Sequence, residues 1–248
     1  DGNGTFDTPW MAYTVATNVF AANTYSVVLG VTNLAGESYM RTNAAYVVVS
    51  PAVLYVSPSG NNTSPYTNWT MASSTIQPAL TLAYDGASVF VGSGSYSIPA
   101  ELSMSRTLNL IGVGGATNVV VQPSIPWVRN LHIGAGATGY RVEGFTFRNA
   151  NMPSGDDNYD GGGIYADPGS SGLVQNCIIT NNIANKGAGI CNRGIMTVRN
   201  CLIANNTGQN WAFSAGIGGQ WNVGRHFIEN CTFVNNWSVW YGGHVGFH

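Results

Sequence analysis

An eight-residue pattern recurs four times in the C-terminal half of the sequence and specifies the architecture. Its clearest copy is Val174-Gln175-Asn176-Cys177-Ile178-Ile179-Thr180-Asn181. Each copy has an aliphatic residue first, a polar residue second, Gly or Asn third, Cys or Phe fourth, Ile or Phe sixth, and Asn last. The four copies, which align without gaps, are residues 142–149, 174–181, 198–205 and 228–235.

The spacing of the copies predicts a solenoid. They begin at residues 142, 174, 198 and 228, so the intervals are 32, 24 and 30 residues. Repeats of about 20 to 50 residues are typical of stacked coils or blades. We interpret 24 residues as one coil, with loop insertions of eight and six residues in the longer intervals. The apolar–polar alternation within each copy then predicts an all-β fold, a parallel β-helix.

The alternation also assigns faces, because successive side chains of a strand point to opposite sides. The first residue of each copy should face the core, and the second should face solvent. A second family of strands is expected to begin at a repeated glycine. Its four members are Gly163, Gly189, Gly216 and Gly243.

Three asparagines at the third position of the pattern predict an amide ladder. They are Asn176, Asn200 and Asn230, and Gly144 takes this position in the first copy. Stacked amides at a turn can hydrogen-bond from coil to coil. Such a ladder satisfies polar groups that would otherwise be buried without partners.

Three cysteines at the fourth position predict a core ladder. They are Cys177, Cys201 and Cys231. Coils stack about 4.8 Å apart, which falls within the Cα separation that a disulfide permits. In-register side chains point the same way, however, which is poor geometry for a bridge. We therefore expect buried reduced thiols that pack as small hydrophobes.

Residues 52–118 are expected to close the N-terminal end of the coil. Apolar residues at helical spacing between Ile76 and Ala83 predict a short helix, which Ser74 or Thr75 can cap. The order YVSPSGNN…STIQPALTLAYDGASVFVGSGSYSI…LNLIGVGG, from Tyr55 to Gly115, resembles the N-terminal cap of bacterial right-handed β-helix proteins. In that family a short helix covers core and strand edges that would otherwise be exposed. The resemblance implies that residues 119–248 form right-handed β-helix repeats.

Residues 1–51 show strand-like runs of a different kind. The string NTYSVVLGVTNLAGES…YVVVSP, from Asn23 to Pro51, resembles the last strands of PKD-type immunoglobulin-like domains. The resemblance implies a partial immunoglobulin-like β-domain. Its other strands were removed or are supplied by another chain.

Charge is sparse, with nine Lys and Arg and eleven Asp and Glu in 248 residues. The charged fraction is 8%, against about 25% in average soluble proteins. Without a positive patch, nucleic-acid binding is not expected. No apolar run is long enough to span a bilayer. We expect an extracellular or cell-surface protein, and a segment of a longer polypeptide because the chain starts without Met.

An acidic cluster lies on the eight-residue insertion. It comprises Asp156, Asp157, Asn158 and Asp160. These oxygens could bind Ca²⁺, although their spacing does not complete an EF-hand loop. The pair Asp156-Asp157 also resembles the Asp-Asp element of polygalacturonase-type hydrolases, but the other motifs of that family are absent. We favour a solvated loop, since Asp and Asn prefer turns.

No catalytic residue is predicted. Arg193, Arg199 and Arg225 fall at different coil positions, and the histidines show no zinc-ligand spacing. No cofactor other than the Ca²⁺ alternative is expected.

Aromatic residues crowd the C-terminal repeats. They are Trp211, Trp221, Trp237, Trp240 and Tyr241. Exposed indoles provide platforms for sugar rings or a protein partner, while covering the next coil is the alternative. Expected glycosylation sites, if the host glycosylates the chain, are Asn61, Asn62 and Asn68.

Two function classes remain open on sequence alone. The favoured one is a non-enzymatic structural or adhesive protein, in its most specific form a subunit of a head-to-tail homopolymeric extracellular fibre. The alternative is a carbohydrate-active β-helix protein, either a polysaccharide lyase or hydrolase or a carbohydrate-binding module, with a surface polysaccharide as its partner.

Overall fold

The computed structural model describes residues 23–32, 35–153, 159–209, 214–219, 224–239 and 242–246. The chain divides into two compact units, residues 1–51 and residues 52–248.

The first unit contains an antiparallel hairpin of two long strands. β1 spans Asn23–Thr32 and β2 spans Ser38–Val49. Their register shifts between Tyr25 and Val27, where a bulge interrupts the pairing. The immunoglobulin-like domain of the PKD type stays a prediction.

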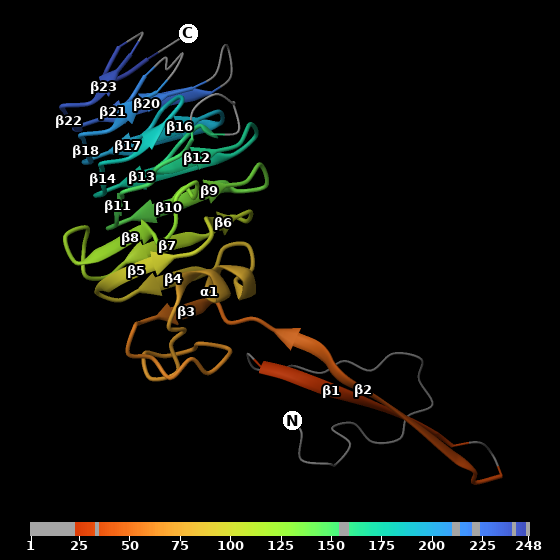
Figure 1. Cartoon of the computed structure of the whole chain (residues 1–248). Helices are drawn as coiled ribbons and strands as arrows, with labels where there is room; N and C mark the ends of the chain where they lie inside the picture. The colour runs from red at the N-terminus through yellow and green to blue at the C-terminus, as the bar shows by residue number, and fades with distance from the viewer. Residues whose placement is uncertain are drawn as a thin grey trace. The chain divides into compact units, whose positions relative to one another are not determined.

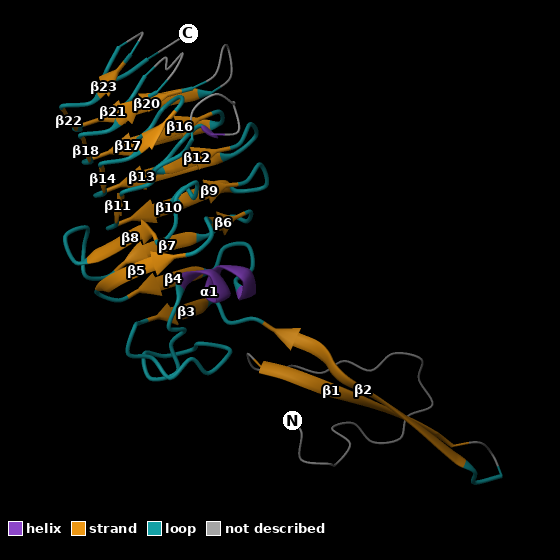
Figure 2. Cartoon of the chain, viewed as in Figure 1, coloured by secondary structure: helices purple, strands orange, loops and turns teal. Residues whose placement is uncertain are grey.

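The second unit is a right-handed parallel β-helix (Figure 1). Among the described residues, four parallel sheets run along it, each taking one strand from successive coils (Figure 2). The first sheet contains β3 (Val53–Val56), β4 (Ser88–Val91), β7 (Asn109–Gly112), β10 (Thr138–Glu143), β13 (Ser171–Gln175), β17 (Ile195–Arg199) and β21 (Arg225–Glu229). The second contains β5 (Gly94–Ile98), β8 (Val119–Pro123), β11 (Thr146–Arg148), β14 (Ile178–Thr180), β18 (Leu202–Ala204) and β22 (Thr232–Val234).

The other two sheets complete the coil. The third contains β6 (Leu102–Met104), β9 (Leu131–Ile133), β12 (Ile164–Ala166), β16 (Ile190–Asn192) and β20 (Ile217–Gly218). The fourth, which lies between the second and third along the chain, contains β15 (Ile183–Ala184), β19 (Thr207–Gly208) and β23 (Trp237–Ser238).

The strand register confirms the alignment made from sequence. Val142 pairs with Val174, Val174 with Val198, and Val198 with Ile228. The first three of these side chains are fully buried. The intervals of 32, 24 and 30 residues are therefore single coils that differ only in their loops.

Left-handed residues bend the chain at two points of each coil. The third position of the pattern has a φ of 77° at Gly144, 52° at Asn176 and Asn200, and 49° at Asn230. Glycine and asparagine adopt this conformation at the least steric cost. The closing asparagines of the pattern also have positive φ, and they are Asn149, Asn181, Asn205 and Asn235. The two recurrent Asn positions are thus explained by backbone geometry.

The repeated glycine before the third sheet is explained by close packing between coils. A Cβ on Gly163 would lie 2.4 Å from the carbonyl oxygen of Gly189, and one on Gly189 would lie 2.5 Å from that of Gly216. Real Cβ atoms do not approach this closely, so the position accepts only glycine.

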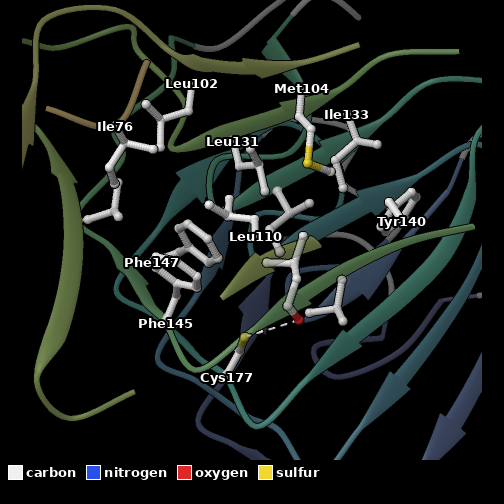
Figure 3. Packing of buried hydrophobic residues seen from close by; sticks show 14 of the residues in the cluster. Ile76, Leu102, Met104, Leu110, Leu131, Ile133, Tyr140, Phe145, Phe147 and Cys177 are labelled. Atoms are coloured by element: carbon white, nitrogen blue, oxygen red, sulfur yellow. Dashed lines mark hydrogen bonds between the residues drawn. The ribbon is translucent and has the colours of Figure 1, made fainter. Parts of the chain in front are cut away.

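The core runs through successive coils from Leu54 to Ile217 and is mainly aliphatic and aromatic. Figure 3 shows part of it. Phe145 and Phe147 stack with ring centroids 5.4 Å apart, and Leu131 and Ile133 are fully buried. Full burial of such side chains contributes about 1.5–3 kcal/mol each. The continuous core makes the coils one cooperative body.

The helix α1 (Ile76–Leu82) packs against β3, β4 and β6 (Figure 1). It buries Ile76, Ala79 and Leu80. Thr75 is the N-cap residue but makes no side-chain capping hydrogen bond. Helix stability here comes from the buried face, as expected for so short a helix.

Candidate functional site

The outward-facing residues of the third sheet form a ladder across successive coils. In β9, Leu131 and Ile133 are buried in the core, so His132 between them faces outward. The same alternation applies to the neighbouring strands. The residues in register with His132 are Ser103, Tyr165, Cys191 and Gly218.

His132 links carboxylates from two other coils. Its Nδ1 lies 3.1 Å from Oε1 of Glu101, which precedes β6, and its Nε2 lies 3.0 Å from Oδ2 of Asp167, which follows β12. Arg129 Nε lies 2.9 Å from the other oxygen of Glu101. The cluster therefore ties three coils together on their outer face.

Tyr165 is enclosed by cationic and aromatic groups. The Arg129 guanidinium lies over its ring, 4.6 Å from the centroid, a cation–π contact. The His132 ring meets it edge-on at 5.4 Å, and Arg193 Nη1 donates a hydrogen bond of 2.9 Å to its hydroxyl. The phenol is thus held in one orientation.

Cys191, next in the ladder, is buried although it faces away from the core. Its electrostatic neighbours are Asp160, Arg193, Arg129 and Lys186, and Asp160 is only 1% exposed. Burial, together with the charge of Asp160, raises the pKa of the thiol. Because the thiolate is the nucleophilic form, Cys191 is not suited to act as a nucleophile.

Hydrogen bonding sets the protonation of the outer cluster. The hydrogen bond to Glu101 raises the pKa of His132, against burial and together with the bond to Asp167. Burial works to raise the pKa of Glu101, but His132 and Arg129 outweigh it and hold that pKa below its usual value. The contacts around His132 thus favour its protonated form and the ionised form of Glu101.

This arrangement fits ligand binding better than acid–base catalysis. A general base must reach the proton that it removes, and both ring nitrogens of His132 are already occupied by carboxylates. Within the described part of the chain, no group of three or more His, Cys, Asp and Glu is arranged to hold a metal ion. The partly exposed carboxylates and Arg193 remain accessible to a polar ligand, whereas Tyr165 is buried beneath them.

An apolar hollow of about 720 Å³ adjoins the cluster at Glu101. It lies between α1 and the turn before β6, and its walls include Ile76, Leu82 and Ile98. The outer face at β6 thus combines charged and aliphatic surface.

The Ca²⁺ alternative is only partly covered by the structure. Asp156, Asp157 and Asn158 lie outside the described residues. Asp160 is described, and it is buried beside Cys191 rather than exposed on a solvated loop.

Of the predicted aromatic platform, only Trp237 lies within the described residues. It is 60% exposed, on β23. The others, outside the described residues, are Trp211, Trp221, Trp240 and Tyr241. The expected glycosylation sites Asn61, Asn62 and Asn68 are exposed.

The predicted ladders differ from those observed. Asn230 Nδ2 donates to Asn200 Oδ1 over 2.7 Å, whereas Asn176 Nδ2 donates to Glu143. All three predicted asparagines are exposed, because a left-handed residue at this turn directs its side chain to solvent.

The buried amide ladder is one position past the closing asparagine of the pattern. Asn182 Nδ2 donates to Asn206 Oδ1, and Asn206 Nδ2 donates to Asn236 Oδ1, over 3.1 and 2.9 Å. Asn130 extends it at the N-terminal end by donating to Asn182. Of the predicted ladder through Asn176, Asn200 and Asn230, the structure thus shows the contact between Asn230 and Asn200, and other asparagines satisfy the buried groups.

The cysteine ladder lies in the core. Cys177 and Cys201 are 1% and 3% exposed, and Cys231 is half-buried in the last described coil. All three thiols are free, as is Cys191.

Sequence reasoning missed Glu101, Arg129, His132 and Tyr165, and it set Arg193 aside as scattered. Aligning the third-sheet strands would have found His132 and Tyr165, because the central residue of each strand faces outward. Glu101, Arg129 and Arg193 lie just outside their strands, where no repeated position marks them. The strand that carries His132, β9, is preceded by Asn130 rather than glycine, so its membership of the repeat was hidden.

Comparison with known proteins supports the fold. A family model for right-handed β-helix regions matches residues 128–246. The pectin methylesterase PemA of Erwinia chrysanthemi is similar in structure, with a TM-score of 0.53 and 15% identity over 74% of this chain and 55% of that one. A mutant pectin methylesterase in complex with a hexasaccharide matches with a TM-score of 0.49 and 15% identity, over 75% and 56% of the two chains.

The chain spans little more than half the length of these enzymes. No curated protein matches the sequence. Among the described residues, no helix has the length and apolar character of a membrane span.

Proposed function

We propose that this chain is an extracellular carbohydrate-active β-helix protein that binds an acidic polysaccharide on the outward face of the third sheet. The observation that carries the proposal is the cluster of Glu101, Arg129, His132, Tyr165 and Arg193 on that face. Because only 8% of the residues are charged, four charged or titratable side chains gathered with a tyrosine on one face stand out from the rest of the sequence.

The chemistry of the cluster suits a uronate residue. A guanidinium has five N–H donors and binds carboxylates through two at once. Arg193 uses Nη1 for Tyr165 and its Nε is enclosed by protein, so Nη2 is the nitrogen that would meet a sugar carboxylate. Glu101 and Asp167, 38% and 31% exposed, can accept hydrogen bonds from sugar hydroxyls. The solved structures of similar fold include a pectin methylesterase, which supports this ligand class.

The proposal assigns binding and no catalytic residue. His132 is held between carboxylates and Cys191 is buried, so neither is free to attack a substrate. Catalysis at the third-sheet face would therefore require a nucleophile or general base that lies outside this cluster.

The test is binding of soluble polygalacturonate by isothermal titration, with a neutral galactomannan as the comparison. Arg193→Gln should weaken polygalacturonate binding about tenfold, the loss expected for one charge-assisted contact. The matched control is Arg199→Gln, since Arg199 pairs with Glu229 on the outer face of the first sheet. Equal affinity of the Arg193→Gln and Arg199→Gln variants would exclude the third-sheet site. Assays for methanol release and for unsaturated or reducing sugar ends would reveal turnover.

The second candidate function is a structural or adhesive role, and the observation that favours it is the hairpin of β1 and β2. Within the described residues of the first unit, these two strands form the only sheet, and they expose Tyr39 and Met40. A two-stranded sheet gains stability from further strands, and strand addition by another copy would extend this one. Regular fibres in electron micrographs of the undenatured chain would support this role, and dispersed single particles would contradict the fibre.

A further inference from the structure

A second surface with a different chemistry lies along the fourth sheet. Its outer residues are in register from coil to coil: Asn151 pairs with Ile183, Ile183 with Thr207, and Thr207 with Trp237. Ala184, next to Ile183, is buried, so Ile183 lies on the outer side of the strand.

A column of amides runs beside these residues. It consists of the left-handed asparagines two positions earlier in each coil, Asn149, Asn181, Asn205 and Asn235. All four are exposed. We call the two columns together the lateral strip, and none of the residues that define it is charged.

Trp127 lies beside the N-terminal end of the strip. Its backbone N–H donates to the carbonyl of Asn151 over 2.9 Å, which places it one coil earlier and opposite Met152, one residue past the register of the column. It is 70% exposed and has a φ of 67°. A bulky residue in the left-handed region is strained by about 1–3 kcal/mol. An exposed, strained indole gains nothing from core packing that would offset this strain.

We propose that the lateral strip binds one chain of a neutral polysaccharide parallel to the helix axis, with sugar rings stacked on Trp127 and Trp237. The two indoles are four coil steps apart, roughly 19 Å along the axis. The step between coils is comparable to the length of one pyranose ring in an extended chain. Each ring of the polysaccharide can therefore meet one amide of the neighbouring column.

We expect a neutral ligand because the two columns carry no charge, and the cation beside them at Asn149, Arg148, is held by the side-chain oxygen of Gln122. Amides donate to and accept from hydroxyls, and indole faces pack on the C–H faces of pyranose rings. A uronate chain along this surface would lose water from each of its carboxylates, while the columns themselves supply no charge to pair with them. The lateral strip and the charged third sheet thus select different ligands.

The test is native affinity electrophoresis of the full chain in gels containing hydroxyethyl cellulose, xylan or galactomannan. At least one gel should retard the protein. Trp127→Asn and Trp237→Ala should each weaken retardation about tenfold, and the double variant should abolish it. Asparagine at 127 tolerates the left-handed backbone, so this variant should fold. Trp69→Ala is the matched control, because Trp69 packs against Tyr55 outside the strip.

Oligosaccharides separate one continuous site from two isolated ones. For the polysaccharide that retards the protein, a pentasaccharide should bind more than about tenfold tighter than the disaccharide. The strip is excluded if no neutral gel retards the protein, if both variants behave as the wild type, or if Trp69→Ala weakens retardation equally. Arg193→Gln should not change neutral retardation, which keeps this result independent of the third-sheet site.

Discussion

The imidazole Nε2 of His132 lies 3.0 Å from Oδ2 of Asp167, 35 residues later in the chain and one coil further along the axis. The other ring nitrogen reaches back to Glu101, so one side chain spans three coils. Only the protonated imidazole can donate to both carboxylates at once. This contact makes the outer face of the third sheet sensitive to pH.

The contribution of His132 to stability should therefore fall as pH rises. Its pKa in the folded protein is raised above 6.5, so the contribution is complete below pH 6.5 and is lost as pH passes through the raised pKa. The melting temperature of the wild type should exceed that of His132→Gln by about 2–4 °C at pH 6. The difference should shrink toward pH 9. A difference independent of pH would contradict the protonated link.

The contribution of Glu101 to stability depends on pH in the opposite direction. The pKa of Glu101 is held below 4.5, so its contribution is present above that value and is lost as pH falls through the folded pKa. Glu101→Gln should therefore differ most from the wild type between about pH 5 and pH 7. Melting temperatures measured from pH 3 to pH 9 test the contributions of Glu101 and His132 in one series.

The buried amide ladder should be far more important to stability than the exposed one. Asn206 donates to Asn236 and Ile179 and accepts from Asn182, all in the interior. Asn206→Ala should lower the free energy of unfolding by about 3 kcal/mol, since several buried groups lose their partners.

Asn200→Ala is the control, because Asn200 is exposed and accepts one side-chain bond, from Asn230. Its effect should stay within about 1 kcal/mol, the cost of placing alanine in the left-handed backbone at this position. Urea denaturation of both variants provides the comparison. Equal losses would show that the inner ladder is not the dominant one.

A single methyl group in the glycine ladder should open the coil stack. A Cβ at Gly189 would lie 2.5 Å from the carbonyl oxygen of Gly216. Gly189→Ala should therefore destabilise the protein by about 3 kcal/mol or more. Gly115→Ala, where no atom lies within 4 Å but φ is 76°, should cost only about 1 kcal/mol. Similar melting temperatures for the two variants would argue against direct contact between coils at Gly189.

The core thiols should be inert in the native protein. Hydrogen bonding with Cys177 and burial raise the pKa of Cys201 to about 12, and Cys177 and Cys191 are buried. Iodoacetamide at pH 8 should leave these three unmodified and should alkylate all four cysteines in denaturant without reductant, as read by intact mass. Resistance to alkylation in denaturant would reveal disulfides instead.

The repeat was predictable because it depends on local chemistry. Inward residues such as Val174 must be apolar, and bends such as that at Asn176 need Gly or Asn, so fold and register can be read from one copy to the next. The short helix at Ile76 was equally clear from its apolar face. The antiparallel strands before residue 51 were visible, but two strands do not define the domain type.

Function was less accessible because the outer face is not constrained by packing. His132, Tyr165 and Cys191 occupy one repeat position, and they share no property that a sequence pattern could detect. The amide ladder illustrates the same limit. The sequence shows paired asparagines such as Asn181-Asn182, but only the left-handed conformation of the first residue turns the second inward.

The β-helix, its register, its bends and its core follow from the order of residues, because they depend on side-chain polarity and backbone freedom within one coil. The clusters on its surface follow from the folded arrangement alone. Glu101, His132 and Asp167 come from three coils, and Trp127 and Trp237 come from opposite ends of the lateral strip. The physical reason is that stacking brings together residues roughly 30 positions apart at the spacing of hydrogen-bonded strands, and the loop lengths that set this register carry no pattern of their own.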